Sequence, residues 1–263
     1  MIYIVDFGSQ VTQLIARRVR EAGVYCEIIS NNSLLKNIEK TGCSGIIFSG
    51  GPASVHKANT PKIDKKAFDL NIPILGICYG MQLICHQLGG KVQLSKKREF
   101  GKTLIKPSKK SILFTGFNRG KTSSHVWMSH GDKVINLPKG FTSIASSSNT
   151  KFAAVENKKK LFYGLQFHPE VVHTPNGHNI IENFVFKICK AKKNWSMKNH
   201  LRNQIKENKR RVKKDKVICG LSGGVDSTVT AAIISKAINN QLTCIYVDTG
   251  LMRKDAVSYT HLT

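Results

Sequence analysis

The sequence has 263 residues, 41% of them hydrophobic, which is enough for the core of one large or two ordinary domains and excludes a disordered chain. Its 41 Lys and Arg residues against 16 Asp and Glu residues give a formal net charge of +25. A field of this sign attracts nucleic acids, anionic lipids and anionic small molecules alike, and a lysine-rich solvated surface is an equally good explanation, so the charge does not select a partner.

The N-terminus has no features of a targeting segment. It runs directly into the apolar stretch 2–5 without a basic region or cleavage site, and no apolar stretch is long enough to span a bilayer. The seven cysteines have no CxxC spacing, and an odd count favours reduced thiols over a disulfide framework or a zinc site. We therefore expect a cytoplasmic protein with no membrane partner.

Strands and helices alternate through the first 90 residues. Thr60 and Pro61 are typical of the N-cap and first residue of a helix. βαβ units at this spacing predict an α/β fold, with a mostly parallel central sheet and helices on both faces. Apolar periodicity predicts these elements in order: strand 2–5, helix 11–22, strand 24–29, helix 34–38, strand 46–48, helix 63–70, strand 73–77 and helix 79–88.

The pattern changes after residue 90. Short apolar runs separated by turn residues predict an antiparallel extension of the sheet, and a helix at 179–189 then closes a first domain spanning 1–190. The runs lie at 103–105, 111–114, 152–156 and 161–166.

A second domain is predicted to begin after a basic segment. Residues 191–216 contain eleven Lys or Arg residues against two acidic ones, with sparse apolar positions that predict a linker helix with a thin buried stripe. A strand at 217–219, a loop to 227, a helix to 237 and a strand at 242–247 form one further βαβ unit within 217–263.

A candidate nucleophile lies between a buried strand and a helix. Cys78 has glycines two positions away on each side, Gly76 and Gly80, as a tight nucleophile elbow requires. A helix N-terminus favours the reactive thiolate. A cysteine in this position could also be a small buried apolar residue, and we expect that role for Cys85, two turns later.

A candidate base and its orienting group follow the strand at 161–166. His168 lies just after the strand end, and Pro169 stiffens the turn so that Glu170 can bind the far ring nitrogen. This segment by itself would also fit a surface turn. A third strand end, followed by the segment from Ser49 to Pro52, offers backbone N–H groups to an oxyanion.

The segments 48–52, 76–82 and 168–170, in this order along the chain, resemble those of the class I (triad) glutamine amidotransferases, and the resemblance covers residues 1–190. The resemblance implies that Cys78 attacks the side-chain amide of glutamine, that His168 is the general acid and base, and that Glu170 orients His168. It also implies oxyanion-hole N–H groups at Gly51 and Tyr79.

The resemblance implies a glutamine-binding role for two further segments. One is Gln82, and the other is the loop of Ser129, His130, Gly131 and Asp132. For this loop, a simple polar turn between two strands is the alternative interpretation.

A glycine-rich loop opens the last predicted helix. It follows a buried strand, so its N–H groups and hydroxyls can form a nest for a pyrophosphate anion, although it lacks the lysine of a Walker A loop. It resembles the loop of the ATP-pyrophosphatases, and a purely structural turn is the alternative. The resemblance implies ATP binding by Ser222, Gly223, Gly224, Val225, Asp226 and Ser227.

The order of the two parts, together with the segments 6–10, 219–221 and 247–254, resembles the GMP synthetase family. This resemblance implies glutamine, ATP and XMP as substrates, Mg²⁺ accompanying the nucleotide with a contribution from Asp226, no certain protein-only metal site, and a full-length homodimer. Residues 256–263 depart from the family pattern, so we expect a chain cut short in its second domain and at most a glutaminase by itself.

Two other functions remain open from the sequence. The first domain could be the glutaminase subunit of another glutamine-dependent synthase, although the fused glycine-rich loop argues against this. The segment 192–216 could bind nucleic acid, but no base-reading motif or aromatic platform accompanies its lysines, so we expect no nucleic-acid partner.

Overall fold

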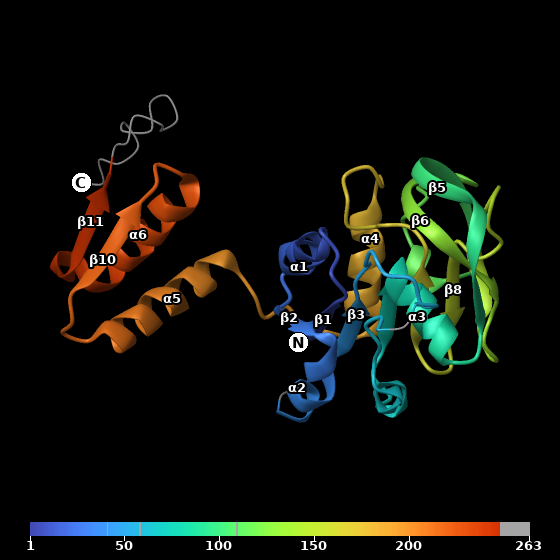
Figure 1. Cartoon of the computed structure of the whole chain (residues 1–263), viewed down its shortest axis with the longest axis horizontal. Coiled ribbons are helices and arrows are strands. Elements are labelled where there is room, and N and C mark those ends of the chain that lie inside the picture. Colours follow the sequence, from blue (N-terminus) through green and yellow to red (C-terminus); the bar gives the residue numbers. More distant parts are fainter. Residues whose placement is uncertain (41, 58, 109, 248–263) are drawn as a thin grey trace. The chain divides into compact units, whose positions relative to one another are not determined.

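The computed structural model describes residues 1–40, 42–57, 59–108 and 110–247 (Figure 1). The chain divides into two compact units, Met1–Asn194 and Trp195–Thr263. The expected domain bounds at 190 and 216 stay predictions, and the expected non-family segment 256–263 lies outside the described residues.

A nine-stranded sheet runs through the described part of the first unit, in the order β2-β1-β3-β4-β9-β8-β7-β5-β6. The five strands from β2 to β9 are parallel, and the remaining neighbours pair antiparallel. The expected α/β class with a mostly parallel core and an antiparallel extension is confirmed. The strands are β1 Ile2–Asp6, β2 Cys26–Ser30, β3 Gly45–Phe48, β4 Ile74–Ile77, β5 Lys91–Pro107, β6 Ser124–Asn136, β7 Thr142–Ser147, β8 Ala154–Asn157 and β9 Phe162–Leu165.

Helices cover both faces of this sheet. Apolar residues of α1 (Thr12–Glu21) and α4 (Gly177–Glu182, continued by the π-helical segment Asn183–Ile188) share one buried cluster. α2 (Leu34–Lys40) and α3 (Tyr79–Gln87) contribute to a second cluster on the other face. Figure 1 shows α1 and α4 together on one side of the strands. Because β3 and β4 are buried between these layers, their carboxyl ends present loops at one edge of a rigid core.

Two local expectations are wrong. The segment expected as a strand at 111–114 is a 3₁₀ helix, Ile112–Phe114, because this turn buries Leu113 while the Asn183 side chain satisfies its carbonyl oxygen. The helix expected at 63–70 is the 3₁₀ helix Lys65–Asp69. Its N-cap is Asp64, whose Oδ1 accepts from the Lys66 N–H at 3.0 Å, and Thr60 does not serve as a cap.

Two strands of the extension were not expected. β6 and β7 supply the pairing partners of β5, whose length exceeds that of the short strand predicted at 103–105. The segment Ser129 to Asp132 therefore lies within β6, and the interpretation of it as a loop or turn between strands is wrong. Its residues are held in a ladder, so their side chains alternate between the two faces of the sheet.

The described part of the second unit contains one βαβ arrangement preceded by a helix. α5 (Met197–Val212) is capped by Ser196, whose Oγ accepts from the Asn199 N–H at 3.2 Å, and it has no buried residue, so the stripe expected there is at most partly buried. β10 (Val217–Leu221) pairs parallel with β11 (Leu242–Tyr246). Between them α6 (Val225–Ile238) begins two residues before the predicted end of the loop.

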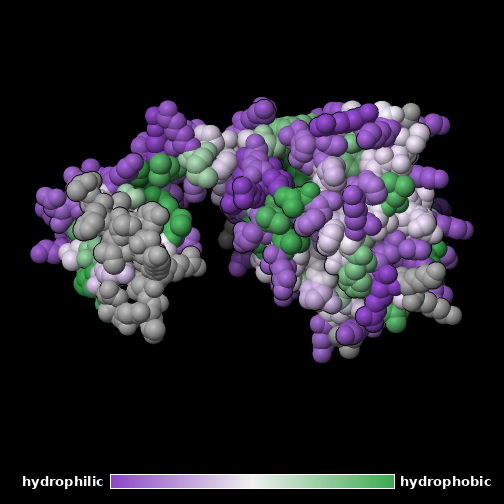
Figure 2. Space-filling view, turned by 90° about the horizontal axis from the view of Figure 1, so that it is seen from above, coloured by the Kyte–Doolittle hydropathy of each residue, from purple (hydrophilic) through white to green (hydrophobic). Residues whose placement is uncertain are grey.

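The surface is consistent with the basic composition. Hydrophilic residues cover most of the face visible in Figure 2, and apolar residues form small patches on it. Among the described helices, none combines the length and the apolar character needed to cross a bilayer.

Candidate active site

Cys78 is the residue between β4 and α3, and its backbone is left-handed, with φ 50° and ψ −105°. The turn is held by two backbone hydrogen bonds, from the Cys78 N–H to the Leu165 carbonyl at 2.7 Å and from the Gln82 N–H to the Cys78 carbonyl at 3.1 Å. A non-glycine residue in this conformation is unusual and is found at functional sites. The elbow expected from the glycine spacing is present.

The two glycines of the elbow are required by close packing. A Cβ on Gly80 would lie 2.6 Å from the Phe48 carbonyl oxygen, and a Cβ on Gly76 would lie 2.5 Å from the backbone of Gly80. In both cases the added Cβ would meet backbone atoms, so no side-chain rotation can relieve the clash. The glycines therefore let the strand and helix approach closely enough for the cysteine to stand at the turn.

His168 faces Cys78 from the segment after β9. Its Nδ1 lies 2.8 Å from Glu170 Oε1, and Glu170 is fully buried. Thr174 Oγ1 donates to the His168 carbonyl at 2.6 Å and accepts from the Trp127 N–H at 3.0 Å. The base is therefore fixed through both its ring and its backbone.

The groups around His168 give it a pKa different from that of an ordinary histidine. Burial by itself lowers the pKa of His168, but the interactions with Cys78 and Glu170 outweigh it and raise the pKa from 6.5 to about 10. An imidazolium at this position favours a neighbouring thiolate. By contrast, burial without a partner raises the pKa of the Cys85 thiol to about 12, which agrees with the core role expected for it.

The sulfur of Cys78 has two further polar neighbours. The Ser129 carbonyl oxygen lies 3.5 Å from Sγ, and Gln166 Nε2 lies 3.8 Å from Sγ. Gln166 has no assigned role in the sequence analysis, although it stands two residues before His168. Gly50 completes the crowded centre, since a Cβ there would lie 3.1 Å from His168 Cε1 and 3.7 Å from Cys78 Cβ.

A cavity of about 800 Å³ opens over the cysteine. Gly51 lines it after β3, and the N–H of Tyr79, the first residue of α3, has no acceptor inside the helix. The side chain of Tyr79 is buried and donates to the Pro61 carbonyl at 2.6 Å, away from the cavity lining. The other expected residues in the lining are Cys78, Gln82, Ser129, His130, Gly131, Asp132 and His168.

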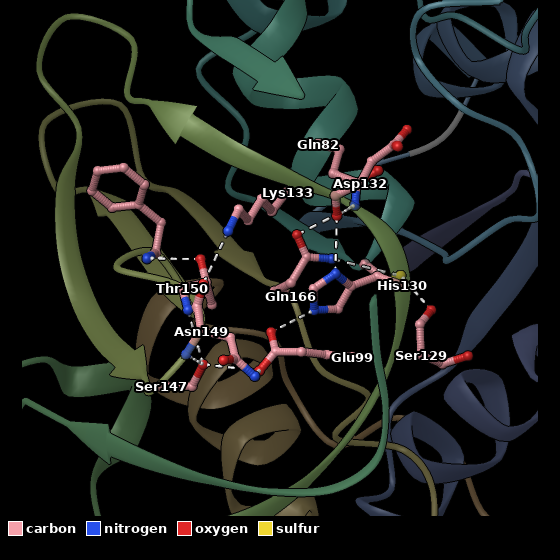
Figure 3. A network of polar contacts seen from close by, with 12 residues as sticks. Gln82, Glu99, Ser129, His130, Asp132, Lys133, Ser147, Asn149, Thr150 and Gln166 are labelled. Carbon is pink, nitrogen blue, oxygen red and sulfur yellow. Dashed lines mark hydrogen bonds and ion pairs between the residues drawn. The ribbon is translucent and has the colours of Figure 1, made fainter. Parts of the chain in front are cut away.

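The expected glutamine-binding side chains make internal hydrogen bonds (Figure 3). Gln82 Nε2 donates to the Asp132 carbonyl at 2.9 Å and to Gln166 Oε1 at 3.3 Å. His130 Nδ1 also lies 2.9 Å from the Asp132 carbonyl oxygen. The structure thus places Gln82, Ser129 and His130 beside Cys78, with the polar ends of Gln82 and His130 already bound within the protein.

The glycine-rich loop of the second unit has the donors of an anion nest. Gly223 has φ +71°, and the loop ends at the N-terminus of α6, where backbone N–H groups are free of helical partners. Ser227 Oγ accepts from the Ser222 N–H at 3.2 Å and lies 3.1 Å from Ser222 Oγ. The free N–H groups at the start of α6 fit a phosphate group, whereas the Ser222 N–H and the Ser227 hydroxyl are bound within the loop. No cluster of three or more His, Cys, Asp or Glu residues suited to a metal occurs in the described part of the chain.

The comparison with known families agrees with this geometry. The description "Glutamine amidotransferase class-I" matches residues 3–188. The chain belongs to the class-I glutamine amidotransferase family. After this amidotransferase region, the description "NAD synthase" matches residues 196–261.

Curated relatives of this amidotransferase are named GMP synthase [glutamine-hydrolyzing]. The protein from Brachyspira hyodysenteriae is 51% identical over 254 residues, or 97% of this chain and 49% of the relative. The one from Acetivibrio thermocellus is 50% identical over the same shares of each chain. The chain thus spans about half the length of the curated relatives it matches.

Solved structures include amidotransferases of the same fold. A protein from Thermoplasma acidophilum that is described as a "putative gmp synthase subunit a protein" matches at 37% identity with a TM-score of 0.61, over 72% of this chain and 93% of that chain. A glutamine amidotransferase from Thermotoga maritima matches at 18% identity with a TM-score of 0.54, over 72% of this chain and 98% of that chain, which speaks for the fold alone.

Proposed function

We propose that the first unit hydrolyses the side-chain amide of L-glutamine to glutamate and ammonia through Cys78, His168 and Glu170. The observation that carries this proposal is the left-handed elbow at Cys78 beside an imidazole that is bound to a fully buried carboxylate. A nucleophile, a base and an orienting group in this relation are the components of covalent acyl transfer.

The chemistry follows from these positions. The thiolate of Cys78 attacks the amide carbon, and the N–H groups of Gly51 and Tyr79 stabilise the developing oxyanion. His168 donates a proton to the departing nitrogen, which leaves as ammonia. A γ-glutamyl thioester then remains on Cys78. His168 then takes a proton from water, and the water oxygen attacks the thioester carbon, which releases glutamate and restores the Cys78 thiolate beside the protonated His168.

Glutamine recognition is proposed for the segment around Ser129 and for Gln82. Because the polar ends of Gln82 and His130 are bound to the Asp132 carbonyl, we assign them to shaping the cavity wall. Ser129 has an exposed side chain that is available to a ligand.

The nucleophile is tested by labelling with 6-diazo-5-oxo-L-norleucine, an electrophilic glutamine analogue. Cys78→Ala should lose both the mass increase and glutamate release, with the rate of release falling by roughly a thousandfold or more. Cys85→Ala should keep both, because Cys85 lies in the core away from the cavity. Labelling that persists in Cys78→Ala would refute the assignment.

For the whole protein we propose ATP-dependent amination of XMP to GMP with ammonia from glutamine. The proposal is supported by the order of the two matched regions and by the relatives named GMP synthase. ATP would bind through the loop from Ser222 to Ser227, and a homodimer is proposed for the full-length protein. When bound, Mg²⁺ would neutralise phosphate charge, held by nucleotide oxygens and at most by the carboxylate of Asp226.

This assignment is tested in a protein of the relatives' full length that contains this sequence. Cys78→Ala in that protein should stop GMP formation with glutamine as the nitrogen donor and retain it with free ammonia. Loss with both donors would place Cys78 outside the glutaminase step.

A further inference from the structure

A buried acid and imidazole lie beneath the wall of the catalytic cavity. His130 Nε2 and Glu99 Oε2 are 3.1 Å apart, and their side chains are 1% and 3% exposed. Burying two ionisable groups costs free energy unless they are paired and hydrogen-bonded. Neither residue belongs to the triad, so the burial of both at this place calls for a separate role.

The neighbours of His130 determine where its proton lies. The Asp132 carbonyl oxygen can only accept, so His130 Nδ1 must donate to it across 2.9 Å. In the neutral ring, the lone pair of Nε2 would then face a carboxylate oxygen at 3.1 Å, which is repulsive. The pair must therefore hold a proton between Nε2 and Oε2, although the two atoms are not aligned well enough for a well-directed hydrogen bond.

The other side of Glu99 is also bound. Its Oε1 accepts from Ser147 Oγ at 3.1 Å and from Asn149 Nδ2 at 3.3 Å (Figure 3). Burial by itself raises the pKa of Glu99, but His130, Ser147 and Asn149 outweigh it and leave the pKa lowered. Glu99 is therefore a carboxylate held by Ser147 and Asn149, and it lies against the His130 ring.

The ladder between β5 and β6 is interrupted at this point. Leu94 pairs with Asp132 and Glu99 pairs with His130, so four residues of β5 oppose Gly131 alone. The extra residues of β5 leave Gly131 without a paired residue, so the ladder holds Ser129, His130 and Asp132 but is broken between the last two. The contact between the side chains of Glu99 and His130 is a cross-strand connection that remains there.

The same segment contacts the catalytic centre. The Ser129 carbonyl lies 3.5 Å from Cys78 Sγ, and the Asp132 carbonyl accepts from Gln82, which donates also to Gln166 beside the sulfur. Figure 3 shows these residues as one connected network running from Ser147 to Ser129. A shift of His130 would move the wall against which a glutamine would lie.

We propose that the Glu99–His130 pair is a positioning device that fixes the β6 segment Ser129 to Asp132 at the edge of the cavity and thereby sets the affinity of the site for glutamine. This inference rests on the proposed glutaminase function. It assigns no direct contact with the substrate to Glu99, which acts through His130.

The test separates affinity from thiol reactivity in the full 263-residue chain. Inactivation by 6-diazo-5-oxo-L-norleucine gives a KI and a limiting rate, and alkylation of Cys78 by iodoacetamide reports the thiol alone. Glu99→Ala should raise KI about tenfold, because it leaves the His130 ring without its partner. Alkylation by iodoacetamide should stay within about twofold, because the contact of His168 with Glu170 is untouched.

A conservative variant and a matched control sharpen the test. Glu99→Gln should restore most of the affinity, because its amide can donate to His130 Nε2 while Nδ1 still donates to Asp132. Glu156→Ala removes another buried glutamate, bound by Ser111 Oγ at 2.7 Å and lying outside the cavity lining, and should leave KI unchanged.

A second variant reaches the same contact from the other side. His130→Asn keeps a donor near Asp132 and removes the contact with Glu99, so it should match Glu99→Ala and guards against misfolding of that variant. The inference is overturned if KI stays at the wild-type value, if Glu156→Ala raises it equally, or if Glu99→Gln is as weak as Glu99→Ala. If the wild-type chain is not inactivated above the level of Cys78→Ala, the proposed function fails and this inference falls with it.

Discussion

Cys78 has a backbone conformation that most residues avoid. Its φ of 50° and ψ of −105° cost on the order of 1–3 kcal/mol for a residue with a side chain. The surrounding close packing of β4, α3 and β3 holds the turn in place. This packing offsets the strain. The resulting conformation presents the sulfur to His168 at the edge of the sheet.

The pKa of His168 should depend on the carboxylate of Glu170. Glu170→Gln removes the carboxylate that helps raise the pKa of His168, while burial continues to lower it and Cys78 continues to raise it, so the pKa should fall below about 10. Titration of the ring protons by NMR measures this, with His168→Gln to assign the signal. An unchanged pKa would show that Glu170 does not control the imidazole.

The same shift predicts how stability depends on pH. The pKa of His168 in the folded protein, about 10, lies above the ordinary value of 6.5. The protonated ring therefore contributes its full stabilisation below pH 6.5, and this contribution is lost as the pH rises through about 10. Urea unfolding should therefore show the largest difference between wild type and Glu170→Gln at the acidic end of this window. A difference that grows toward pH 10 would contradict the assignment.

At the scale of elements, the junction of β4 with α3 depends on close backbone approach. The glycines at positions 76 and 80 allow this approach, and Phe48 in β3 is the residue that Gly80 meets. A side chain at either position would push the helix away from the strand and displace Cys78 with it.

Gly80→Ala should therefore destabilise the first unit. Its Cβ would lie 2.6 Å from the Phe48 carbonyl oxygen, and overpacking of about 1–3 kcal/mol should exceed the gain of up to about 1 kcal/mol in helix propensity. The free energy of unfolding in urea measures the net change. Gly42→Ala is the control, because nothing lies within 4 Å of its Cβ position, and equal stability of the two variants would argue against the packing requirement.

At the scale of the whole molecule, the candidate glutaminase residues all lie in the unit Met1–Asn194. The end of this unit is fastened by Asn194, whose N–H donates to the Gly23 carbonyl at 3.0 Å and whose Oδ1 accepts from the Tyr25 N–H at 2.8 Å. The candidate ATP loop lies in the other unit.

A chain shortened to residues 1–194 should therefore fold and retain the Cys78-dependent reaction with the glutamine analogue. It should show no affinity for Mg-ATP by calorimetry, because the loop from Ser222 to Ser227 is absent. A chain ending at residue 190 lacks Asn194 and should unfold at a lower temperature. Loss of Cys78 labelling in the 1–194 chain would show that the site depends on the second unit.

Most local features of this protein could be predicted from the amino-acid sequence. The alternation of strands and helices, the elbow at Cys78 and the turn from His168 to Glu170 depend on residues close together in the chain, so periodicity and glycine spacing were sufficient to predict them. The family resemblance added the proposed roles of Gly51, Tyr79, Gln82, Ser129 and His130, which residue types alone could not assign.

Only the tertiary structure decided how the wall of the site is built. Strands β5, β6 and β7 pair across tens of residues, and this pairing converts a predicted loop into a strand that buries His130 and exposes Ser129. It also brings Glu99 beneath the cavity and Gln166 beside the sulfur. Such contacts depend on the register of distant strands, which leaves no periodic signal in the chain, because register is fixed by the packing of the whole sheet.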